Sequence, residues 1–229
     1  MLTIKKFLII TLVTFAFYAS AQIPMGGWRM HISPKQALDV TVYQNNIFAA
    51  LNNGLLSYNL ESKEKTLRTA ADALSDVQLT SLVHEPVNDV LFIGYQNGNL
   101  DLLKGNRIFN LPAIVQASTV SGPRRINTMV AHEGDVYLAT AFGAIVVINT
   151  ANREVRDTYY PNLNGEGIVD LTFSNDTLYA LTNNRLFKGA LNNNFLADPS
   201  QWLEATYLPE YSNFGNYNQL TFFNDNLFL

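Results

Sequence analysis

The apolar residues of this chain are grouped in short runs that alternate with polar residues, and one such pattern recurs along most of the sequence. In residues 135–148, DVYLATAFGAIVVI, the pattern predicts a strand centred on Tyr137, a turn at Gly143 and a second strand. The central aromatic residue returns in four other segments, which gives a period of 42 to 49 residues, at Phe48, Phe92, Tyr179 and Phe228. A period in the forties built from short strands predicts a repeated β-sheet unit.

A glycine follows the aromatic residue by six positions in three of the five copies, at Gly54, Gly98 and Gly143. Glycine at a constant place between two strands predicts a tight turn that uses its backbone freedom. The fourth copy has Arg185 at this distance from its aromatic residue. The same turn is therefore predicted in the first three repeats, with a variant in the fourth.

Each of the first four repeats divides into four predicted strands, which we name A to D in chain order. Strand B is the most apolar and carries small residues beside its aromatic, which would let neighbouring sheets approach closely. Strand D is the most polar, as expected of an outer edge. The predicted strands are 38–44, 46–51, 54–60 and 65–69, then 79–85, 89–95, 98–103 and 107–111, then 126–133, 135–140, 144–149 and 154–160, then 168–174, 177–181, 185–190 and 202–207, and finally 218–223 and 226–229.

This organisation predicts an all-β fold, a β-propeller with four-stranded antiparallel blades. Residues 22–229 hold about four and a half repeats of roughly 44 residues each, so the propeller is expected to be incomplete. The chain also ends inside an apolar strand. We therefore expect residues 22–229 to be a partial N-terminal propeller from a longer protein.

The first 21 residues have the pattern of a secretory signal peptide. Lys5 and Lys6 form the charged start, residues 7–18 form an apolar run, and Ala19-Ser20-Ala21 is a small-residue cleavage site. The apolar run is too short for a transmembrane anchor, which is the alternative interpretation. We expect export from the cytoplasm, a mature chain that starts at Gln22, and no membrane-spanning segment in it.

Residues 26–33, GGWRMHIS, alternate Trp28, Met30 and Ile32 with polar positions and stand outside the repeat. They predict a short strand. In propellers a strand from one terminus often completes the last blade and removes the exposed sheet edges. We assign this role to residues 26–33.

Composition excludes several classes of function. The chain has no cysteine, which excludes disulfides, a thiol nucleophile, cysteine-ligated zinc and a lipidated N-terminal cysteine. Its net charge is −4, and the mature chain is more acidic because Lys5 and Lys6 lie in the leader. A protein that binds nucleic acid needs a basic face, so this balance argues against nucleic-acid partners.

The sequence carries no known catalytic or cofactor motif, and we expect neither catalysis nor a cofactor. The histidines His31, His84 and His132 lie far apart without metal-ligand spacing, which favours turn or surface roles over a metal site. Propeller glycosidases use paired acids in the central channel, so an enzyme that degrades polysaccharides remains an alternative. Its candidates, Asp39 and Asp170 on strand A and Asp101 on strand C, do not stand at equivalent positions of the repeat.

One face of the predicted propeller gathers the polar residues of the turns. In an antiparallel four-stranded blade, the B–C turns and the D–A links emerge on the same side, together with the arginine pair Arg124 and Arg125 in a long link. Such a face is able to bind a sugar chain or an anionic group. Asparagine is also simply favoured in tight turns, which is the structural alternative. The candidate binding residues of the turns are Asn52, Asn53, Gln96, Asn97, Ala141, Phe142, Asn183, Asn184 and Arg185.

The repeat resembles the propellers of periplasmic two-component regulators, and more closely the N-terminal propeller of the PorZ family of the Bacteroidetes type IX secretion system. The sequence segments that show the resemblance occur in the same order as in the family and span most of the mature chain: GGWRMHI, NGLLSYN, ALSDVQLTSL, YQNGNLDLL, INTM, DVYLATAFGAIVVI and REVRDTYY. The family has two propellers of seven blades and a C-terminal β-sandwich, so the resemblance implies a fragment of a probable seven-bladed ring.

The resemblance also implies a function. Family members are non-enzymatic components at the outer membrane, on the periplasmic or cell-surface side. They work with a PorU-type sortase and with PorV and PorQ to attach secreted cargo to anionic lipopolysaccharide, which the family is thought to engage. A periplasmic sensor propeller that binds a glycan in a hybrid two-component system is the alternative from a different class.

Overall fold

We describe a computed structural model of the chain over residues 36–161, 164–205, 217–224 and 226–229. The predicted signal peptide and the predicted strand at residues 26–33 lie outside the described residues. The described residues belong to one compact unit that runs from Ser33 to Leu229.

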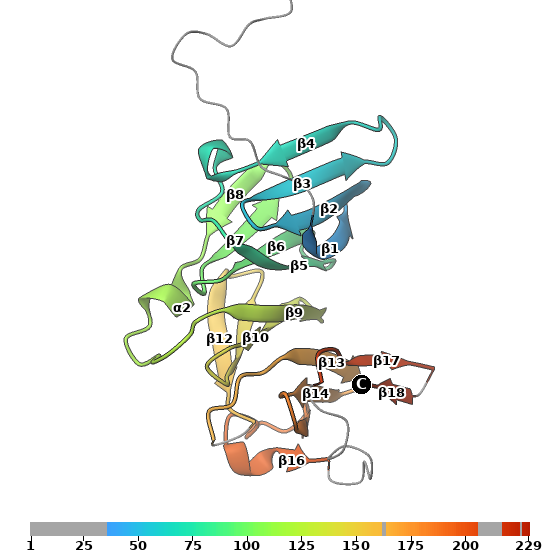
Figure 1. Cartoon of the computed structure of the whole chain (residues 1–229). Helices are drawn as coiled ribbons and strands as arrows, with labels where there is room; N and C mark the ends of the chain where they lie inside the picture. The colour runs from blue at the N-terminus through green and yellow to red at the C-terminus, as the bar shows by residue number, and fades with distance from the viewer. Residues whose placement is uncertain (1–35, 162–163, 206–216, 225) are drawn as a thin grey trace, which may run out of the picture. The chain divides into compact units, whose positions relative to one another are not determined.

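Within this unit the strands form antiparallel sheets that follow the repeat one by one (Figure 1). Four sheets have four strands, each in simple chain order, and a two-stranded sheet follows them. The first two sheets are β1 (Ala37–Tyr43), β2 (Asn46–Leu51), β3 (Gly54–Asn59) and β4 (Lys65–Arg68), then β5 (Leu79–Glu85), β6 (Val90–Tyr95), β7 (Leu100–Lys104) and β8 (Arg107–Asn110).

The remaining sheets are β9 (Ile126–His132), β10 (Asp135–Thr140), β11 (Ile145–Asn149) and β12 (Glu154–Tyr159), then β13 (Asp170–Ser174), β14 (Thr177–Leu181), β15 (Leu186–Ala190) and β16 (Leu203–Glu204), and finally β17 (Thr221–Phe223) and β18 (Asn226–Phe228). Short helices lie in the links, namely η1 (Ala70–Asp72), α2 (Ala113–Gln116) and η2 (Pro199–Gln201). The all-β fold class and the four-stranded antiparallel sheets predicted from the repeat are confirmed.

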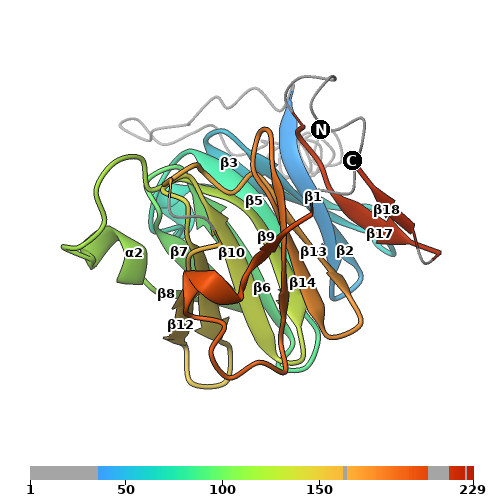
Figure 2. The same ribbon diagram turned by 90° about the horizontal axis from the view of Figure 1, so that it is seen from below.

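The first strands of successive sheets lie next to one another, so the sheets are arranged around a common side (Figure 2). Contacts join β1 to β5, β5 to β9, β9 to β13 and β13 to β17. Each hydrophobic cluster lies between two consecutive sheets, such as the one in which Phe48 of the first sheet packs with Leu82 and Ile93 of the second. Each sheet therefore buries its apolar faces against its neighbours, as the repeat pattern requires.

Strand B carries the core, and its small residues admit the neighbouring sheet. Phe92 is fully buried, and Tyr137 is nearly so. A Cβ atom placed on Gly94 would lie 2.6 Å from the Ser81 hydroxyl and 3.1 Å from a methyl group of Ile126, which begins the next sheet. The predicted role of small residues on strand B is therefore confirmed at Gly94. The outer D strands β4, β8, β12 and β16, predicted to be the most polar, hold only one buried residue, at the end of β12.

The fourth sheet departs from the sequence prediction at its outer edge. Strand D was predicted over residues 202–207, but β16 covers only Leu203–Glu204, and residues 206–216 lie outside the described part. Trp202 is not in the strand. Its indole N–H donates to the carbonyl of Leu196 at 2.9 Å, and its ring packs in the core between the third and fourth sheets. Burial of this large aromatic residue takes the place of strand pairing.

The two strand A aspartates occupy equivalent positions, contrary to the sequence interpretation. Asp39 pairs with Ala50 and Asp170 pairs with Leu181, and each partner is the fifth residue of its strand B. Asp39 accepts a hydrogen bond of 2.7 Å from the backbone N–H of Leu82 in the next sheet. Asp170 makes the same contact with Leu220, also at 2.7 Å. These carboxylates fasten consecutive inner strands to each other.

Both carboxyls have a raised pKa, because their partial burial disfavours the charged form more than the backbone N–H donors favour it. The unfolded chain then loses its protons at lower pH than the folded chain, so stability falls as pH rises above the ordinary value of 3.8. We expect the double substitution Asp39→Asn and Asp170→Asn to remove this slope. Urea unfolding of both proteins across a pH series measures it. A wild-type stability that rises relative to the variant over this range would contradict the prediction.

Candidate functional site

The B–C turns and the D–A links lie together on one face, as the topology predicts. The backbone N–H of Gln96 donates to the carbonyl of Gln78 at 3.0 Å, and that of Ala141 donates to the carbonyl of Arg125 at 2.9 Å. In the fourth sheet the carbonyl of Asn183 accepts from Tyr217 at 3.1 Å. We call this surface the turn face.

The B–C turns have two lengths, which corrects the single turn predicted from the glycine spacing. In the third sheet the hydroxyl of Thr140 contacts both backbone groups of Ala144, four residues later. In the fourth sheet the equivalent hydroxyl of Thr182 makes the same contacts with Arg185, three residues later. Arg185 therefore corresponds to Ala144, and the fourth turn lacks the glycine position rather than substituting it.

The longer turns do need their glycine. Gly98 and Gly143 have φ values of +86° and +85°, in the region that side chains rarely adopt. They also touch the neighbouring links, because a Cβ atom on Gly98 would lie 2.6 Å from the carbonyl oxygen of Arg124. On Gly143 it would lie 2.8 Å from the carbonyl oxygen of Glu166. Gly54 belongs to the shorter turn and has no left-handed φ.

The asparagines of the shorter turns are not required by backbone geometry. Asn52, Asn53 and Asn183 are exposed and do not have positive φ, whereas Asn45 and Asn175 in the A–B turns do. Tight-turn preference therefore explains the A–B asparagines and not these three. Asn97 differs from them because its amide oxygen accepts from the N–H of Asn99 at 3.0 Å and its amide nitrogen donates to Asp76.

Arg124 is used by the link in which it lies. Its guanidinium donates to the carbonyls of Val115, Ala117 and Val120, at 3.0 Å for Ala117 and 3.1 Å for Val120. These carbonyls belong to the segment around helix α2, so Arg124 holds the long link in shape. It is a structural residue, although the sequence placed it among the candidates for binding an anion.

The side chain of Arg125, the residue after Arg124, does not make such contacts. Among the arginines of the described residues, Arg125 is the one whose side chain has no hydrogen bond, ion pair or ring contact, and its Nε atom is buried and unpartnered. Its backbone is bonded to Ala141, and Arg124 before it touches Gly98. Arg125 therefore lies between the B–C turns of the second and third sheets. A buried guanidinium donor without a partner is costly, so Arg125, unlike Arg124, is not explained by contacts within the protein.

The other candidates divide between packing and the surface. Phe142 is partly buried and packs against the core between the second and third sheets, so its ring is part of the packing and is not free to stack on a ligand. Gln96 and Asn97 are exposed in the turn next to Arg125. The structure therefore brings together Gln96, Asn97, Arg125 and Phe142, while Asn52 and Asn53 belong to the first sheet and Asn183 and Arg185 to the fourth.

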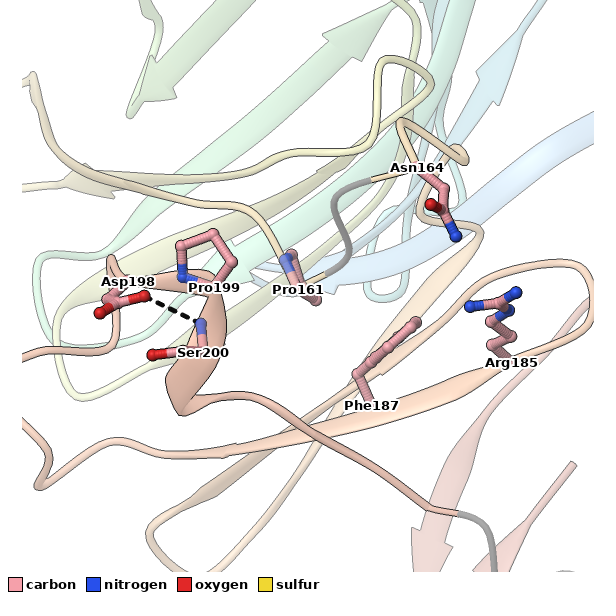
Figure 3. Close-up of a pocket in the computed structure, with 7 residues that line it drawn as sticks. All are labelled: Pro161, Asn164, Arg185, Phe187, Asp198, Pro199 and Ser200. Carbon is pink, nitrogen blue, oxygen red and sulfur yellow. Dashed lines mark hydrogen bonds between the residues drawn. The ribbon is translucent and has the colours of Figure 1, made fainter.

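Arg185 lies at one end of a pocket of about 430 Å³ (Figure 3). Its Nε and Nη1 atoms are each 3.9 Å from a carboxylate oxygen, of Glu166 and of Glu204 respectively. Two acids flank the single guanidinium, so this pocket does not favour an anionic ligand, in contrast to the surroundings of Arg125. The pocket lining is Pro161, Asn164, Arg185, Phe187, Asp198, Pro199 and Ser200.

The carboxylates that suggested a glycosidase all have structural hydrogen bonds. Asp101 is fully buried and accepts from the Tyr95 hydroxyl at 2.6 Å, from the backbone N–H of Ser75 at 2.8 Å and from the Asn110 amide at 3.0 Å. Burial and the neighbouring Asp101 carboxylate raise the pKa of Tyr95. Together with the contacts of Asp39 and Asp170 between sheets, this favours fold maintenance over acid–base chemistry for all three.

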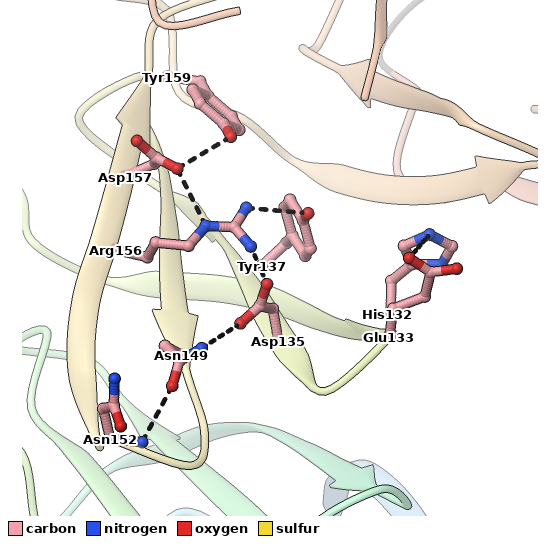
Figure 4. A network of polar contacts seen from close by, with 9 residues as sticks. All are labelled: His132, Glu133, Asp135, Tyr137, Asn149, Asn152, Arg156, Asp157 and Tyr159. Atoms are coloured by element: carbon pink, nitrogen blue, oxygen red, sulfur yellow. Dashed lines mark hydrogen bonds and ion pairs between the residues drawn. The ribbon is translucent and has the colours of Figure 1, made fainter. Parts of the chain in front are cut away.

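A second polar network surrounds Arg156 on β12 (Figure 4). The guanidinium pairs with Asp135, contacts Asp157 at 3.0 Å and reaches the Tyr137 hydroxyl at 3.4 Å. Burial raises the pKa of Asp135, and the charge of Arg156 opposes that shift. Each charged group in the network has a partner from the same sheet, so the network stabilises the third sheet.

The histidines of the described residues take part in packing. The ring of His132 is stacked on Phe173 with 4.3 Å between centroids, and His84 lies 3.2 Å from a carboxylate oxygen of Asp89 and beside the ring of Tyr43. Over the described ranges, no group of three or more histidine, aspartate or glutamate side chains is placed to hold a metal ion. His31 lies outside those ranges.

The family of this chain is identified by a match to a family model that spans most of the sheets. Residues 47–203 match the model of the type IX secretion system PorZ N-terminal β-propeller domain, which is more than half of the chain. The chain belongs to this PorZ propeller family. Among curated proteins, none matches the chain.

One solved structure agrees with the family, and a second shares the fold. The chain is similar to PorZ, a bacterial surface component of the type IX secretion system of Porphyromonas gingivalis, with 27% identity, a TM-score of 0.63 and 73% of this chain covered. The extracellular domain of BT4673, a putative one-component system of B. thetaiotaomicron, has 16% identity, a TM-score of 0.59 and 74% of this chain covered. The second likeness shows the propeller fold alone.

The PorZ match has a limited extent. The chain covers 22% of the length of the PorZ structure and 22% of the BT4673 structure. Within the described residues, no helix is long and apolar enough to cross a membrane. In this PorZ-type propeller, sequence reasoning placed the candidate residues on the turn face but missed that Arg124 and Arg125 differ. The positions of the carbonyl groups in the link around α2 are what distinguish these two arginines, and they cannot be predicted from the sequence.

Proposed function

We propose that this chain is the recognition part of a PorZ-type component of type IX secretion, a scaffold without catalytic activity. The family match and the 27% identity to PorZ support the system. The structural roles of Asp39, Asp101 and Asp170 support a non-enzymatic role, because no described carboxylate among these three is left for acid–base work. The 16% identity of the BT4673 regulator domain gives less support to a glycan-sensing role.

In this proposal the protein is exported through the signal peptide at residues 1–21 and acts at the outer membrane. There it assists a PorU-type sortase, with PorV and PorQ, in attaching secreted cargo to anionic lipopolysaccharide. These partners come from the family resemblance. A chain in which repeated sheets present polar turns on one face suits such a scaffold, because the sheets are rigid and the turns are free to vary.

The observation that carries the proposal is the free guanidinium of Arg125. The Nη nitrogens of Arg125 are not among its buried atoms, and they gain a charge-assisted hydrogen bond when a carboxylate or phosphate reaches them. Gln96 lies in the adjoining turn and supplies an exposed amide suited to sugar hydroxyls, whereas the amide of Asn97 already bonds Asn99 and Asp76. An anionic saccharide therefore fits the chemistry of this part of the turn face.

The test replaces Arg125 by glutamine in the intact protein. We expect binding to purified anionic lipopolysaccharide to weaken by about tenfold or more, the effect of losing one charge-assisted contact. In the native host, the same variant should release secreted cargo into the medium. Surface plasmon resonance and cell fractionation measure the two effects.

The matched control is Lys104→Gln, which removes a positive charge from an exposed residue at the end of β7. It should leave both binding and cargo attachment unchanged. If Arg125→Gln bound lipopolysaccharide as the wild type does, the assignment of Arg125 would be wrong. Normal cargo attachment in a host that lacks the whole protein would refute the secretion role itself.

A further inference from the structure

The connection between β15 and β16 differs from its counterparts in the other sheets. Strands C and D are joined by residues 60–64 in the first sheet, 105–106 in the second and 150–153 in the third, but by residues 191–202 in the fourth. We call residues 191–202 the fourth-sheet insert. It occupies the place that a longer strand D holds elsewhere, because β16 has only two residues.

The insert is a built structure with its own hydrogen bonds and core residues. The side chain of Asn193 accepts from the N–H of Phe195 at 2.9 Å and donates to Gln201 at 3.0 Å. Leu196 and Trp202 enter the core, and a Cβ atom on Gly189 would lie 2.5 Å from a methyl group of Leu196. The insert is therefore fixed on β15.

The insert forms one wall of the 430 Å³ pocket, and the D–A link from the third sheet forms another. The apolar part of the lining is Pro161, Phe187 and Pro199. In Figure 3, Asp198 and Ser200 lie at one end of this pocket and Arg185 lies at the other, with Pro161 and Phe187 between them. The pocket is thus an apolar slot with opposite charges at its two ends.

The balance of charge around the slot is negative. Arg185 is flanked by Glu166 and Glu204, each 3.9 Å away, so its charge is compensated within the protein. Asp198 at the other end is exposed and accepts a hydrogen bond from the N–H of Ser200 at 2.9 Å. Hydrogen bonding from the backbone and then from the side chain of Ser200 lowers the pKa of Asp198.

We propose that this slot binds a lysine or arginine side chain of a partner polypeptide. The aliphatic stem of such a side chain covers the prolines and Phe187, and its cationic head reaches Asp198. At the other end, the guanidinium of Arg185 suits a backbone carbonyl of the partner segment and fixes its direction. The site lies at the outer edge of the fourth sheet and does not involve Arg125, so the inference stands apart from the proposed function.

Charge decides between this occupant and the other candidates. An acidic side chain would meet Asp198, Glu166 and Glu204 against one compensated arginine, which is unfavourable. A purely apolar side chain would fill the slot but leave Asp198 without a counter-ion. The net charge of −4 on the whole chain also favours encounter with a basic partner.

The experiment is ligand-observed saturation-transfer NMR on the intact protein with three small probes of equal backbone. They are the Nα-acetyl N-methylamides of L-arginine, L-leucine and L-glutamate. We expect the arginine probe to receive saturation on its side-chain CH₂ protons and to bind more tightly than the other two. Asp198→Asn should weaken it about threefold to fivefold, as for an exposed ion pair. Asparagine still caps the N–H of Ser200, so the fold is kept.

The control variant is Asp176→Asn, which removes an exposed carboxylate from the A–B turn of the same sheet and should leave binding unchanged. The Arg125→Gln protein should also bind the arginine probe normally, which separates this site from the proposed function. Equal or tighter binding of the leucine or glutamate probe would overturn the inference. So would an Asp198→Asn protein that binds the arginine probe as the wild type does.

Discussion

Replacement of Asp101 by alanine is expected to lower the free energy of unfolding by about 3–5 kcal/mol, one of the largest effects of any single substitution in the described residues. Asp101 is fully buried on β7 and accepts from Tyr95, Ser75 and Asn110. Alanine would remove this shared acceptor, although the Asn110 amide also donates to Asn99 and Leu100. The three donors lie in three different segments, so the loss also releases the link that contains Ser75 from the second sheet.

Chemical denaturation of the intact protein, followed by tryptophan fluorescence and circular dichroism, measures this effect. Asp101→Asn is the informative companion, because it keeps one acceptor oxygen and should cost less than alanine. Asp176→Ala removes an exposed carboxylate and should change stability by no more than about 0.5 kcal/mol. A cost for Asp101→Ala as small as that of Asp176→Ala would show that the network does not hold the link.

Gly98→Ala is expected to destabilise the second sheet by about 3 kcal/mol or more, from two separate sources. The φ of +86° is unfavourable for any residue with a Cβ atom, by about 1–2 kcal/mol. The new methyl group would also lie 2.6 Å from the carbonyl oxygen of Arg124 and 2.8 Å from Ile114 Cγ2. The long link around α2 must then move away from the turn, and Arg125 moves with it.

Gly122→Ala separates the two sources of this cost. Gly122 has a φ of +89° but nothing lies within 4 Å of its Cβ position, so alanine there meets only the backbone penalty. The difference between the two variants in urea unfolding is therefore the cost of the close approach. If the two variants lost equal stability, the contact between the B–C turn and the Arg124 carbonyl would have no energetic weight.

The strands could be predicted from the sequence because their alternation is strong and the repeat confirms each one several times. The predicted limits of strand B are those observed at Asn46–Leu51 and Asp135–Thr140. The same regularity misled the prediction of the turns. Counting six residues from the aromatic made Gly54 and Gly98 look alike, although their turns differ by one residue in length.

The candidate site could be predicted as a face but not residue by residue. Topology places the B–C turns beside the D–A links in any antiparallel blade, so Gln96, Asn97 and Arg125 were found. Whether an arginine is free depends on which carbonyls its side chain can reach, and the link that holds Arg124 has no regular structure beyond the single turn of α2. The equivalence of Asp39 and Asp170 was open to sequence reasoning but was missed, because each precedes the strand B aromatic of its repeat, Phe48 or Tyr179, by nine residues.

The bonds between neighbouring sheets are unevenly distributed from the inner to the outer strands. At the inner strands, Asp39 and Asp170 each form a hydrogen bond to the next sheet. At the outer strand β8, the contact with the third sheet is a cation–π contact, in which the guanidinium of Arg153 lies 3.8 Å from the centre of the Phe109 ring. The C–D connections differ in this respect, because in the second sheet Gly105 donates to the Tyr43 hydroxyl of the first sheet at 3.1 Å and Asn106 accepts from Arg68. The hydrogen bonds of residues 60–64 stay within the first sheet. Epitope tags or grafted loops therefore belong in residues 60–64, where added length disturbs no bond to the next sheet.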